Sequence, residues 1–273
     1  MLTQLEARNS AGSLLSLQLE DISDGYVLQR VDGLDPVNAV LISSDYAQQD
    51  GAQFHSARRL TRNIVLTIGL EPDWAVDTVK SLRARLYSFF MPKSQVELRF
   101  IDSEDPTVSI TGRIENCETV LFSKDPVIDV SIVCFDPDFI ELTDEEIEGD
   151  TVDDTTETLV EYVGTVETGL IFTLNVDRSL TEFTFYHRTP DGQIKTLDFA
   201  ASMVADDVLT INTITGSKGA VLTRAAVNSS VLYGVTPQSV WHEFQPGDNY
   251  IRVFAEGAAI PFTITYTNRY GGL

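Results

Sequence analysis

Alternating apolar and polar positions dominate the first half of the chain and predict a mainly β structure. Such alternation over short segments is typical of strands with one buried face. We expect strands at 62–70, 95–101, 108–114, 118–122 and 127–135. One segment differs, because apolar residues between Pro72 and Phe90 recur every three or four positions. This spacing produces one buried stripe and predicts a helix over 72–90, which Pro92 ends.

The second half predicts many short strands separated by turns. We expect strands near 159–166, 170–176, 182–188, 194–199, 207–214, 219–224, 239–244, 250–255 and 260–267. Turn sequences such as Pro190-Asp191-Gly192 lie between them, about 8 to 12 residues apart. This arrangement is typical of an antiparallel β-sandwich, and no helix is expected after Phe90.

Acidic residues are concentrated between the two halves. Residues 136–161 contain 12 acids, and no Lys or Arg occurs between Lys124 and Arg178. A dense block of like charge resists collapse, so we expect an extended or mobile linker there. The sequence therefore predicts a first domain over 1–140, an acidic linker over 141–158 and a second domain over 159–273.

The overall charge restricts the partners of the chain. With 19 basic and 41 acidic residues the formal net charge is −22, so phosphate-rich ligands are repelled and binding of nucleic acid through a basic patch is disfavoured. The sequence contains no apolar run long enough to span a membrane and no signal-peptide pattern at its start. We therefore expect a protein assembled in a cytoplasm, without contact with a membrane.

The two cysteines are too few for a disulfide framework or a thiolate zinc site. Pairing Ser123 with Pro126 in a turn places Cys117 opposite Ile132 on the neighbouring strand, so that Cys117 and Cys134 become diagonal neighbours. In a cytoplasm such thiols remain reduced. We expect both to be free and buried as small apolar side chains.

No pattern of residues predicts an enzyme, a metal site or a cofactor site. Acid pairs such as Asp136 with Asp138 or Asp153 with Asp154 could serve a glycoside hydrolase, but chance pairs are expected among 41 acids. The segment from Asp144 to Thr155 approaches a calcium loop but lacks its short ligands and its bidentate Glu. The three histidines have no second ligand at metal-binding spacing, which favours surface or core roles; they are His55, His187 and His242.

Several stretches of the chain together carry a resemblance to a known family. In the first half they are Gly25-Tyr26-Val27, Val31-Asp32-Gly33-Leu34, the polar hairpin from Asp45 to Ser56, Arg58-Arg59, Arg62-Asn63-Ile64-Val65-Leu66 and Val96-Glu97-Leu98-Arg99-Phe100. In the second half they are Gly164-Thr165-Val166-Glu167-Thr168-Gly169, Asp207-Val208-Leu209-Thr210-Ile211-Asn212-Thr213, Gln245-Pro246-Gly247-Asp248-Asn249 and the ending from Tyr266 to Leu273. In their order, spacing and total length, over nearly the whole chain, they resemble the distal tail (Dit) proteins of siphovirus-type bacteriophages.

The resemblance implies a structural virion protein at the tail tip, and no enzyme. The first domain would have a tail-tube-like β-sandwich or barrel fold with one long helix, and the second a galectin-like, carbohydrate-module-like antiparallel β-sandwich. Six copies would form a ring that joins the tail tube protein to the tail-associated lysin, tail hub or tip protein, with receptor-binding or fibre proteins as further partners. DNA would pass through the ring without specific binding, since negative walls repel phosphates.

Two sets of residues are candidates for contacts. The hairpin is the candidate interface arm, and its residues are Asp45, Gln48, Asp50, Gly51 and His55. In the second domain Trp241 or Tyr250 could stack on a sugar ring, which would make the chain a carbohydrate-binding phage or bacterial surface adhesin instead. The competing interpretation, that these aromatics fill the sandwich core, is favoured by the alternation around them.

Overall fold

The computed structural model describes residues 2–47, 50–120, 124–257 and 259–273, and the chain divides into two units. Unit 1 comprises Met1–Leu142 together with Tyr270–Leu273, and unit 2 comprises Thr143–Arg269. Each unit has its own cluster of buried apolar side chains. The chain therefore folds around two separate cores, and its last residues return to unit 1.

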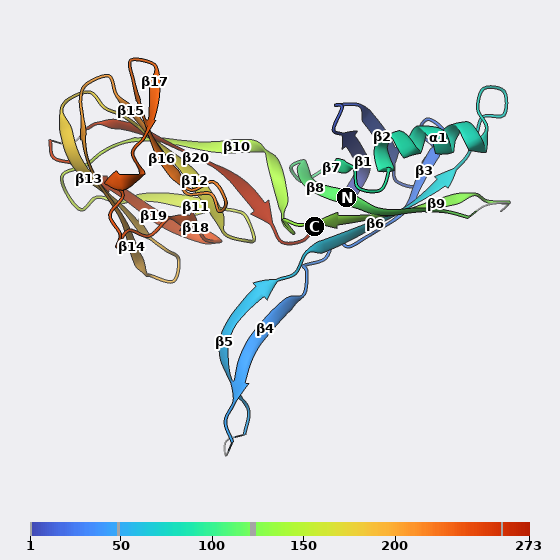
Figure 1. The fold of residues 1–273 in the computed structure, drawn as a ribbon, viewed down its shortest axis with the longest axis horizontal. Coiled ribbons are helices and arrows are strands. Elements are labelled where there is room, and N and C mark those ends of the chain that lie inside the picture. The colour runs from blue at the N-terminus through green and yellow to red at the C-terminus, as the bar shows by residue number, and fades with distance from the viewer. Residues whose placement is uncertain (1, 48–49, 121–123, 258) are drawn as a thin grey trace. The chain divides into compact units, whose positions relative to one another are not determined.

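Unit 1 is an antiparallel β structure with one long helix (Figure 1). Its elements are β1 (Leu2–Asn9), β2 (Leu14–Gln18), β3 (Tyr26–Asp32), β4 (Ala39–Asp45), β5 (Ala52–Arg59), β6 (Arg62–Leu70), α1 (Val79–Phe90), β7 (Gln95–Asp102), β8 (Val108–Thr119), β9 (Val127–Cys134) and the start of β10 (Phe139–Asp150). Seven strands form one sheet in the order β2-β1-β7-β8-β9-β6-β3. A bridge between Leu19, directly after β2, and Leu28 on β3 connects the two ends of the sheet, so the sheet curls back on itself.

The helix α1 closes the core of unit 1 but is shorter than the sequence predicts. It begins at Val79, not at Pro72, because Thr78 is its N-cap and forms a capping box with Ser81. The preceding residues form a separate turn, in which the Asp73 carboxylate accepts from the amide of Ala75. The end of the helix is as expected: Met91 adopts an extended conformation before Pro92.

Unit 2 contains only β-strands and one short 3-10 turn, η1 (Leu232–Gly234), among its described residues. The strands are β11 (Thr158–Tyr162), β12 (Thr168–Asn175), β13 (Leu180–Arg188), β14 (Ile194–Met203), β15 (Val208–Asn212), β16 (Gly219–Arg224), β17 (Val227–Ser230), β18 (Glu243–Phe244), β19 (Gly247–Phe254), β20 (Pro261–Tyr270) and most of β10. One sheet has the order β17-β16-β15-β12-β20-β10 and the other β11-β19-β13-β14. Phe172 on β12 packs against Phe183 and Phe185 on β13, which joins the two sheets into one core.

The mainly β, antiparallel fold with one long helix is thus confirmed, whereas the acidic linker is not seen. Most of 141–158 belongs to β10, which pairs with β8 through Ile140 and Glu141 and lies next to β20. The acidic side chains of β10 are largely exposed to water, and Ile147 packs against the core of unit 2. Exposure leaves the charges hydrated, so their repulsion does not prevent strand pairing.

The register of β8 and β9 also differs from the expected one. Cys117 lies opposite Val130, in the register that Thr119 opposite Ile128 sets next to the turn, and Ile132 pairs with Ile114 beyond a bulge. The two cysteines are therefore not diagonal neighbours. Both are free, with Cys134 buried and Cys117 half-buried. Ser123, on which the expected turn depended, lies outside the described residues.

Candidate functional site

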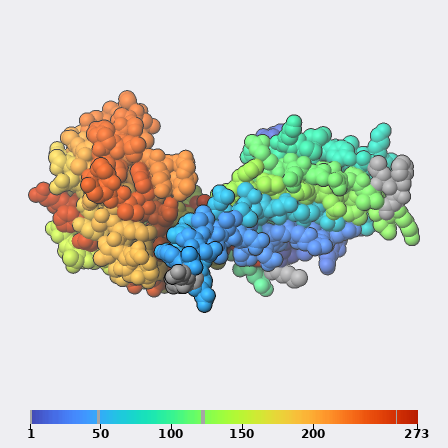
Figure 2. Space-filling model, turned by 60° about the horizontal axis from the view of Figure 1, so that its bottom comes forward, coloured from blue at the N-terminus to red at the C-terminus, as the bar shows by residue number. Residues whose placement is uncertain are grey.

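Strands β4 and β5 form a hairpin, here called the arm (39–59), that extends from unit 1 (Figure 1). Its two strands pair from Ala39 opposite Arg59 to Asp45 opposite Ala52. They form a sheet of their own, apart from the other described strands. Every residue of β5 is exposed, and Figure 2 shows the side chains of the arm standing on the surface of the molecule.

The arm carries large apolar side chains that the described chain leaves in contact with water. Leu41 is 68% exposed, Phe54 61%, Tyr46 54% and Ile42 49%. Single exposed apolar residues are common, but a contiguous group on one projecting element marks an interaction surface. The arm therefore has the composition of a contact element.

The residues expected at the interface lie on the arm as predicted from the sequence, although the arm is longer than the expected segment from Asp45 to Ser56. Asp45 ends β4, and His55 on β5 is hydrogen-bonded to the Ser44 hydroxyl at 2.7 Å. Asp50 and Gly51 are exposed near the tip, and Gly51 has a φ of +89°. Gln48 lies outside the described residues. Whether these residues make an interface stays a prediction.

The sequence analysis predicts neither the apolar surface of the arm nor the polar contacts at its base. The apolar surface is visible in the sequence, since Val40-Leu41-Ile42 is an apolar run beside a polar turn. At the base, Arg59 forms an ion pair with Asp138, whose carboxylate is almost fully buried. The second contact of this pair, from Arg59 Nη2 to Asp138 Oδ2, is 2.9 Å long. The end of the arm is thus attached to the segment between β9 and β10.

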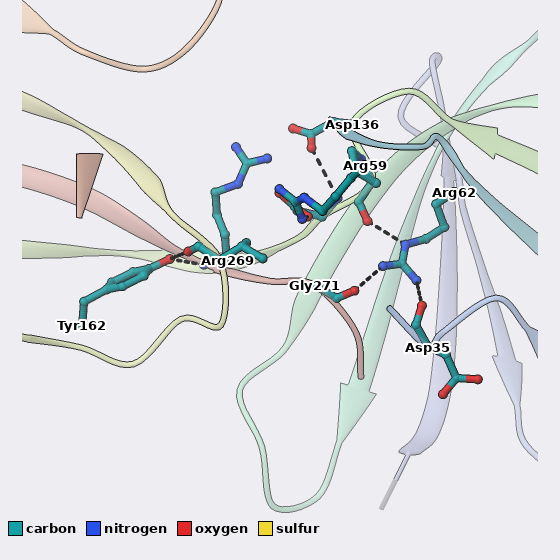
Figure 3. Close-up of polar contacts among 10 residues, drawn as sticks. Asp35, Arg59, Arg62, Asp136, Tyr162, Arg269 and Gly271 are labelled. Carbon is teal, nitrogen blue, oxygen red and sulfur yellow. Dashed lines mark hydrogen bonds and ion pairs between the residues drawn. The ribbon is translucent and has the colours of Figure 1, made fainter. Parts of the chain in front are cut away.

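Arg62, the first residue of β6, is the centre of this base. Its side chain is 1% exposed and donates from Nη1 to the carbonyl oxygens of Gly33 and Asp35 at 2.6 and 2.7 Å. Nε donates to the Pro137 carbonyl at 2.6 Å and Nη2 to the Gly271 carbonyl at 2.7 Å. Figure 3 shows the guanidinium group directed at Asp35 and Gly271.

Burial lowers the pKa of Arg62, and the nearby Cys134 and Asp138 act in the opposite direction. An arginine nevertheless remains charged at neutral pH. The guanidinium carbon also lies 4.4 Å from the ring centroid of Phe139, a favourable cation–π distance. Arg62 therefore connects the loop before the arm, the segment after β9 and the C-terminal residues through charge-assisted hydrogen bonds.

Gly33, whose carbonyl oxygen accepts a hydrogen bond from Arg62, occupies a position that requires glycine. Its φ is +90°, and a Cβ atom there would lie 2.0 Å from the carbonyl oxygen of Asn63. No L side chain fits such a position without moving the backbone. The loop entering the arm is therefore constrained both by its own backbone and by Arg62.

Each of the two carbohydrate candidates is partly covered by other residues of unit 2. Trp241 is half-buried and packs against the core of unit 2. Tyr250 lies opposite Arg188 on the neighbouring strand, and the Arg188 guanidinium lies 3.9 Å from its ring centroid. One face of the Tyr250 ring is thus already covered. Sugar binding by these residues stays a prediction.

The other candidate groups have structural surroundings. Asp138 is held by Arg59, and the segment that approaches a calcium loop is mainly strand β10. His187 and His242 are fully buried in unit 2. No set of three His, Cys, Asp or Glu side chains in the described ranges could hold a metal ion. The helices of the described chain are too short or too polar to cross a membrane.

The surroundings of the cysteines predict slow thiol chemistry. Burial raises the pKa of Cys134 to about 11 and also raises that of Cys117. Because the thiolate is the reacting form, we expect Cys134 in the native protein to react with Ellman's reagent at least ~100-fold more slowly than an unperturbed thiol. Both thiols should react rapidly in guanidinium chloride. A disulfide between them found by intact mass spectrometry would contradict this expectation.

Comparison with known proteins identifies a family domain in the second half of the chain. Residues 163–270 match the family described as siphovirus-type tail component, C-terminal domain. No curated protein matches the chain in sequence. The solved structure of the Dit protein (gp 19.1) of phage SPP1 is similar with a TM-score of 0.69 and 18% identity, over 97% of this chain and 98% of that chain. That protein is described as a paradigm of the hub adsorption apparatus in phages that infect Gram-positive bacteria.

A chain of the phage P2 baseplate, in its activated conformation with Ca, aligns with a TM-score of 0.46 and 8% identity over 100% of both chains. The domain match lies almost entirely in unit 2, whereas the SPP1 likeness extends over 97% of the chain. Residues 163–270 therefore contain the domain described as siphovirus-type tail component, C-terminal domain, and the chain has the fold of the SPP1 Dit protein.

Proposed function

We propose that six copies of this chain close into a ring at the distal end of the phage tail. The ring joins the tail tube protein to the tail-associated lysin or tip protein and leaves an opening for the genome. Receptor-binding or fibre proteins attach around it, and assembly takes place in the cytoplasm of the bacterial host. Unit 2, as a galectin-like module, projects outward and supplies docking surface for these neighbours.

The observation that carries the proposal is the arm. Its apolar side chains are exposed on a hairpin whose strands pair with no other described strand. The base of the arm, in contrast, is held by Arg62 and by the ion pair of Arg59 with Asp138. A firmly anchored element with an uncovered apolar surface is suited to repeat the same contact from one copy to the next. Repetition of one rotation closes a ring.

The charge of the chain supports passage of DNA. A formal net charge of −22 repels phosphates, so duplex DNA would not form ion pairs that hold it in the opening. We expect no measurable retention of duplex DNA by the purified protein at physiological salt.

Removing the apolar surface of the arm tests the ring. In the triple variant Leu41→Ser, Ile42→Ser and Phe54→Ser we expect the hexamer fraction to fall at least ~10-fold, because each contact loses about 1.5 to 3 kcal/mol per buried side chain. Native mass spectrometry and negative-stain microscopy of the full chain measure this fraction. Thermal unfolding of the monomer should change little, since the three side chains lie outside the core.

A matched control removes exposed apolar residues elsewhere. Val163, Ile194 and Val227 on unit 2 are each 66% exposed, and their replacement by serine should leave the hexamer unchanged. Equal losses in both triple variants would contradict a specific role for the arm. Isolated tails without a six-fold ring containing this chain would contradict the proposed function itself.

A further inference from the structure

A groove in unit 1 lies away from the arm and has the opposite charge pattern. It has a volume of about 690 Å³ and lies between α1, the end of β6 and the end of β8. Its lining includes Trp74, Val79 and Val120, and Trp74 is 76% exposed. An aromatic ring so exposed beside a groove is typical of a surface that binds another chain.

The rim of the groove carries basic side chains in an otherwise acidic chain. Lys80, Arg83 and Lys124 line it, against only Glu71 and Asp125 among the acids. Lys80 and Lys124 are exposed, and neither has an ion pair within the described ranges. The Nε atom of Arg83 is buried without a hydrogen-bond partner in the part of the chain described. The groove is thus lined by exposed apolar side chains and by more basic than acidic side chains.

The outer part of the arm has the complementary composition. Between Ile42 and Ser56 the charged residues are Asp45 and Asp50, and no Lys or Arg occurs there. Both acids are exposed and form no ion pair within the described residues. Phe54 and Tyr46 supply exposed aromatic rings on the same segment. An apolar and acidic arm therefore matches an apolar and basic groove.

The arm and the groove lie at opposite ends of one strand. β6 begins at Arg62, directly after the arm, and ends at Leu70, which lines the groove. Eight residue steps along a strand separate them by about 26 Å. Figure 1 shows the arm leaving unit 1 at the end away from the start of α1. Complementary surfaces at opposite ends of a subunit join copies head to tail, which is the contact that a closed ring requires.

We propose that the arm of one copy binds in this groove of the next copy, with Asp45 and Asp50 near Lys80 and Lys124. This inference rests on the proposed ring and names the surface that receives the arm. The apolar residues of the arm then cover Trp74 and Val120. Both surfaces, each exposed in the single chain, become buried in the assembly.

Charge reversal and its rescue test the contact. We expect Lys80→Glu with Lys124→Glu to lower the hexamer fraction at least ~5-fold at about 50 mM salt, and less at about 500 mM salt, because salt screens exposed charges. Asp45→Lys with Asp50→Lys should have a similar effect. Combining all four substitutions should restore the hexamer to near the original fraction. The control pair Lys195→Glu with Lys218→Glu changes the net charge equally on unit 2 and should have no effect.

A cysteine pair provides an independent readout. In the variant Phe54→Cys with Trp74→Cys we expect oxidation to produce covalent oligomers up to the hexamer, whereas each single variant should not. The inference is wrong if the double-cysteine variant forms hexamers that oxidation does not cross-link and the charge-reversal variants form as many hexamers as the original protein. The proposed ring would still stand in that case. If the original protein and isolated tails contain no ring, the proposed function fails and this inference fails with it.

Discussion

Replacing Arg62 with methionine is expected to lower the free energy of unfolding of unit 1 by about 4 kcal/mol. Methionine fills most of the volume but leaves four carbonyl oxygens without their charged donor. Each buried acceptor left without a partner costs about 1 to 3 kcal/mol, so four such carbonyls are consistent with a loss of about 4 kcal/mol. Since the four carbonyls come from three separate segments, the base of the arm should loosen as well.

Urea unfolding followed by circular dichroism measures the loss of stability. Hydrogen exchange then locates it, and faster exchange is expected at Leu60, whose amide donates to the Asn38 carbonyl at the base of the arm, and at Leu273, whose amide donates to Leu34. Arg62→Lys should recover less than half of the loss, because one ammonium group cannot reach all four carbonyls in the fork geometry of arginine.

The matched control for this experiment is Arg30→Met. Arg30 forms an ion pair with Asp32, but both side chains are well exposed. Such pairs contribute about 0 to 1 kcal/mol, so the control should be nearly neutral. A loss below about 1 kcal/mol in Arg62→Met would show that solvent or rearranged backbone replaces the network.

The strands around Arg62 could be predicted from the sequence, whereas the contacts of Arg62 could not. The alternation of β6, β7 and β9 is a local pattern, and these strands occur where expected. The partners of Arg62 lie 27, 29, 75 and 209 residues away in the chain. No local pattern encodes such contacts, and an arginine at the start of a strand ordinarily indicates an exposed side chain.

The start of α1 and the course of β10 were predicted wrongly for different reasons. The apolar stripe suggested a helix from Pro72, but the capping box of Thr78 and Ser81 is a stronger local signal for a start at Val79. In β10 the density of acids suggested a linker, although Ile147 and Gly149 alternate with acidic residues as strand residues do. A Cβ at Gly149 would lie 2.7 Å from the Phe262 ring, so the close approach of β20 requires glycine there.

The sequence predicts the position of the arm but not its separation from the main sheet or its exposed apolar surface. A polar turn between two short segments indicated a hairpin, and Asp45 and His55 lie on it. Its separation from the main sheet follows from tertiary structure, since β6 pairs with β3 and β9 and leaves no edge for β4 or β5. The same separation exposes Leu41 and Phe54, which alternation alone would have placed in a core.

Acidification is expected to destabilise unit 2 through two buried histidines. His187 and His242 are fully buried, with ring centroids 5.4 Å apart. His242 Nε2 is hydrogen-bonded to the Phe185 carbonyl at 2.9 Å and His187 Nε2 to Asn249 Oδ1 at 2.9 Å. Their Nδ1 atoms have no partner in the described part of the chain. Neither ring can therefore gain a second proton without a buried charge that lacks a counterion.

Burial lowers the pKa of His242 to about 3 and lowers that of His187, with Lys195 acting in the same direction on both. An unfolded histidine has a pKa of about 6.5, so below that pH the unfolded state binds protons that the folded state excludes. The stabilisation is complete above pH ~6.5 and is lost as the pH falls towards the folded-state value. At pH 5 His242 alone should reduce the free energy of unfolding by about 2 kcal/mol.

Urea unfolding at pH 7 and pH 5 in a Trp74→Phe background, in which the half-buried Trp241 is the remaining tryptophan, measures this change in unit 2 by fluorescence. His242→Phe removes the titrating group from an aromatic environment that includes Phe185, so it should lower stability at pH 7 but remove about 2 kcal/mol of the acid dependence. His55→Gln on the exposed arm is the control and should leave the dependence unchanged. Protonation of the many acidic residues relieves their repulsion equally in all three proteins. If His242→Phe retains the full acid dependence, the carboxylates and not the buried histidines govern the response of unit 2 to pH.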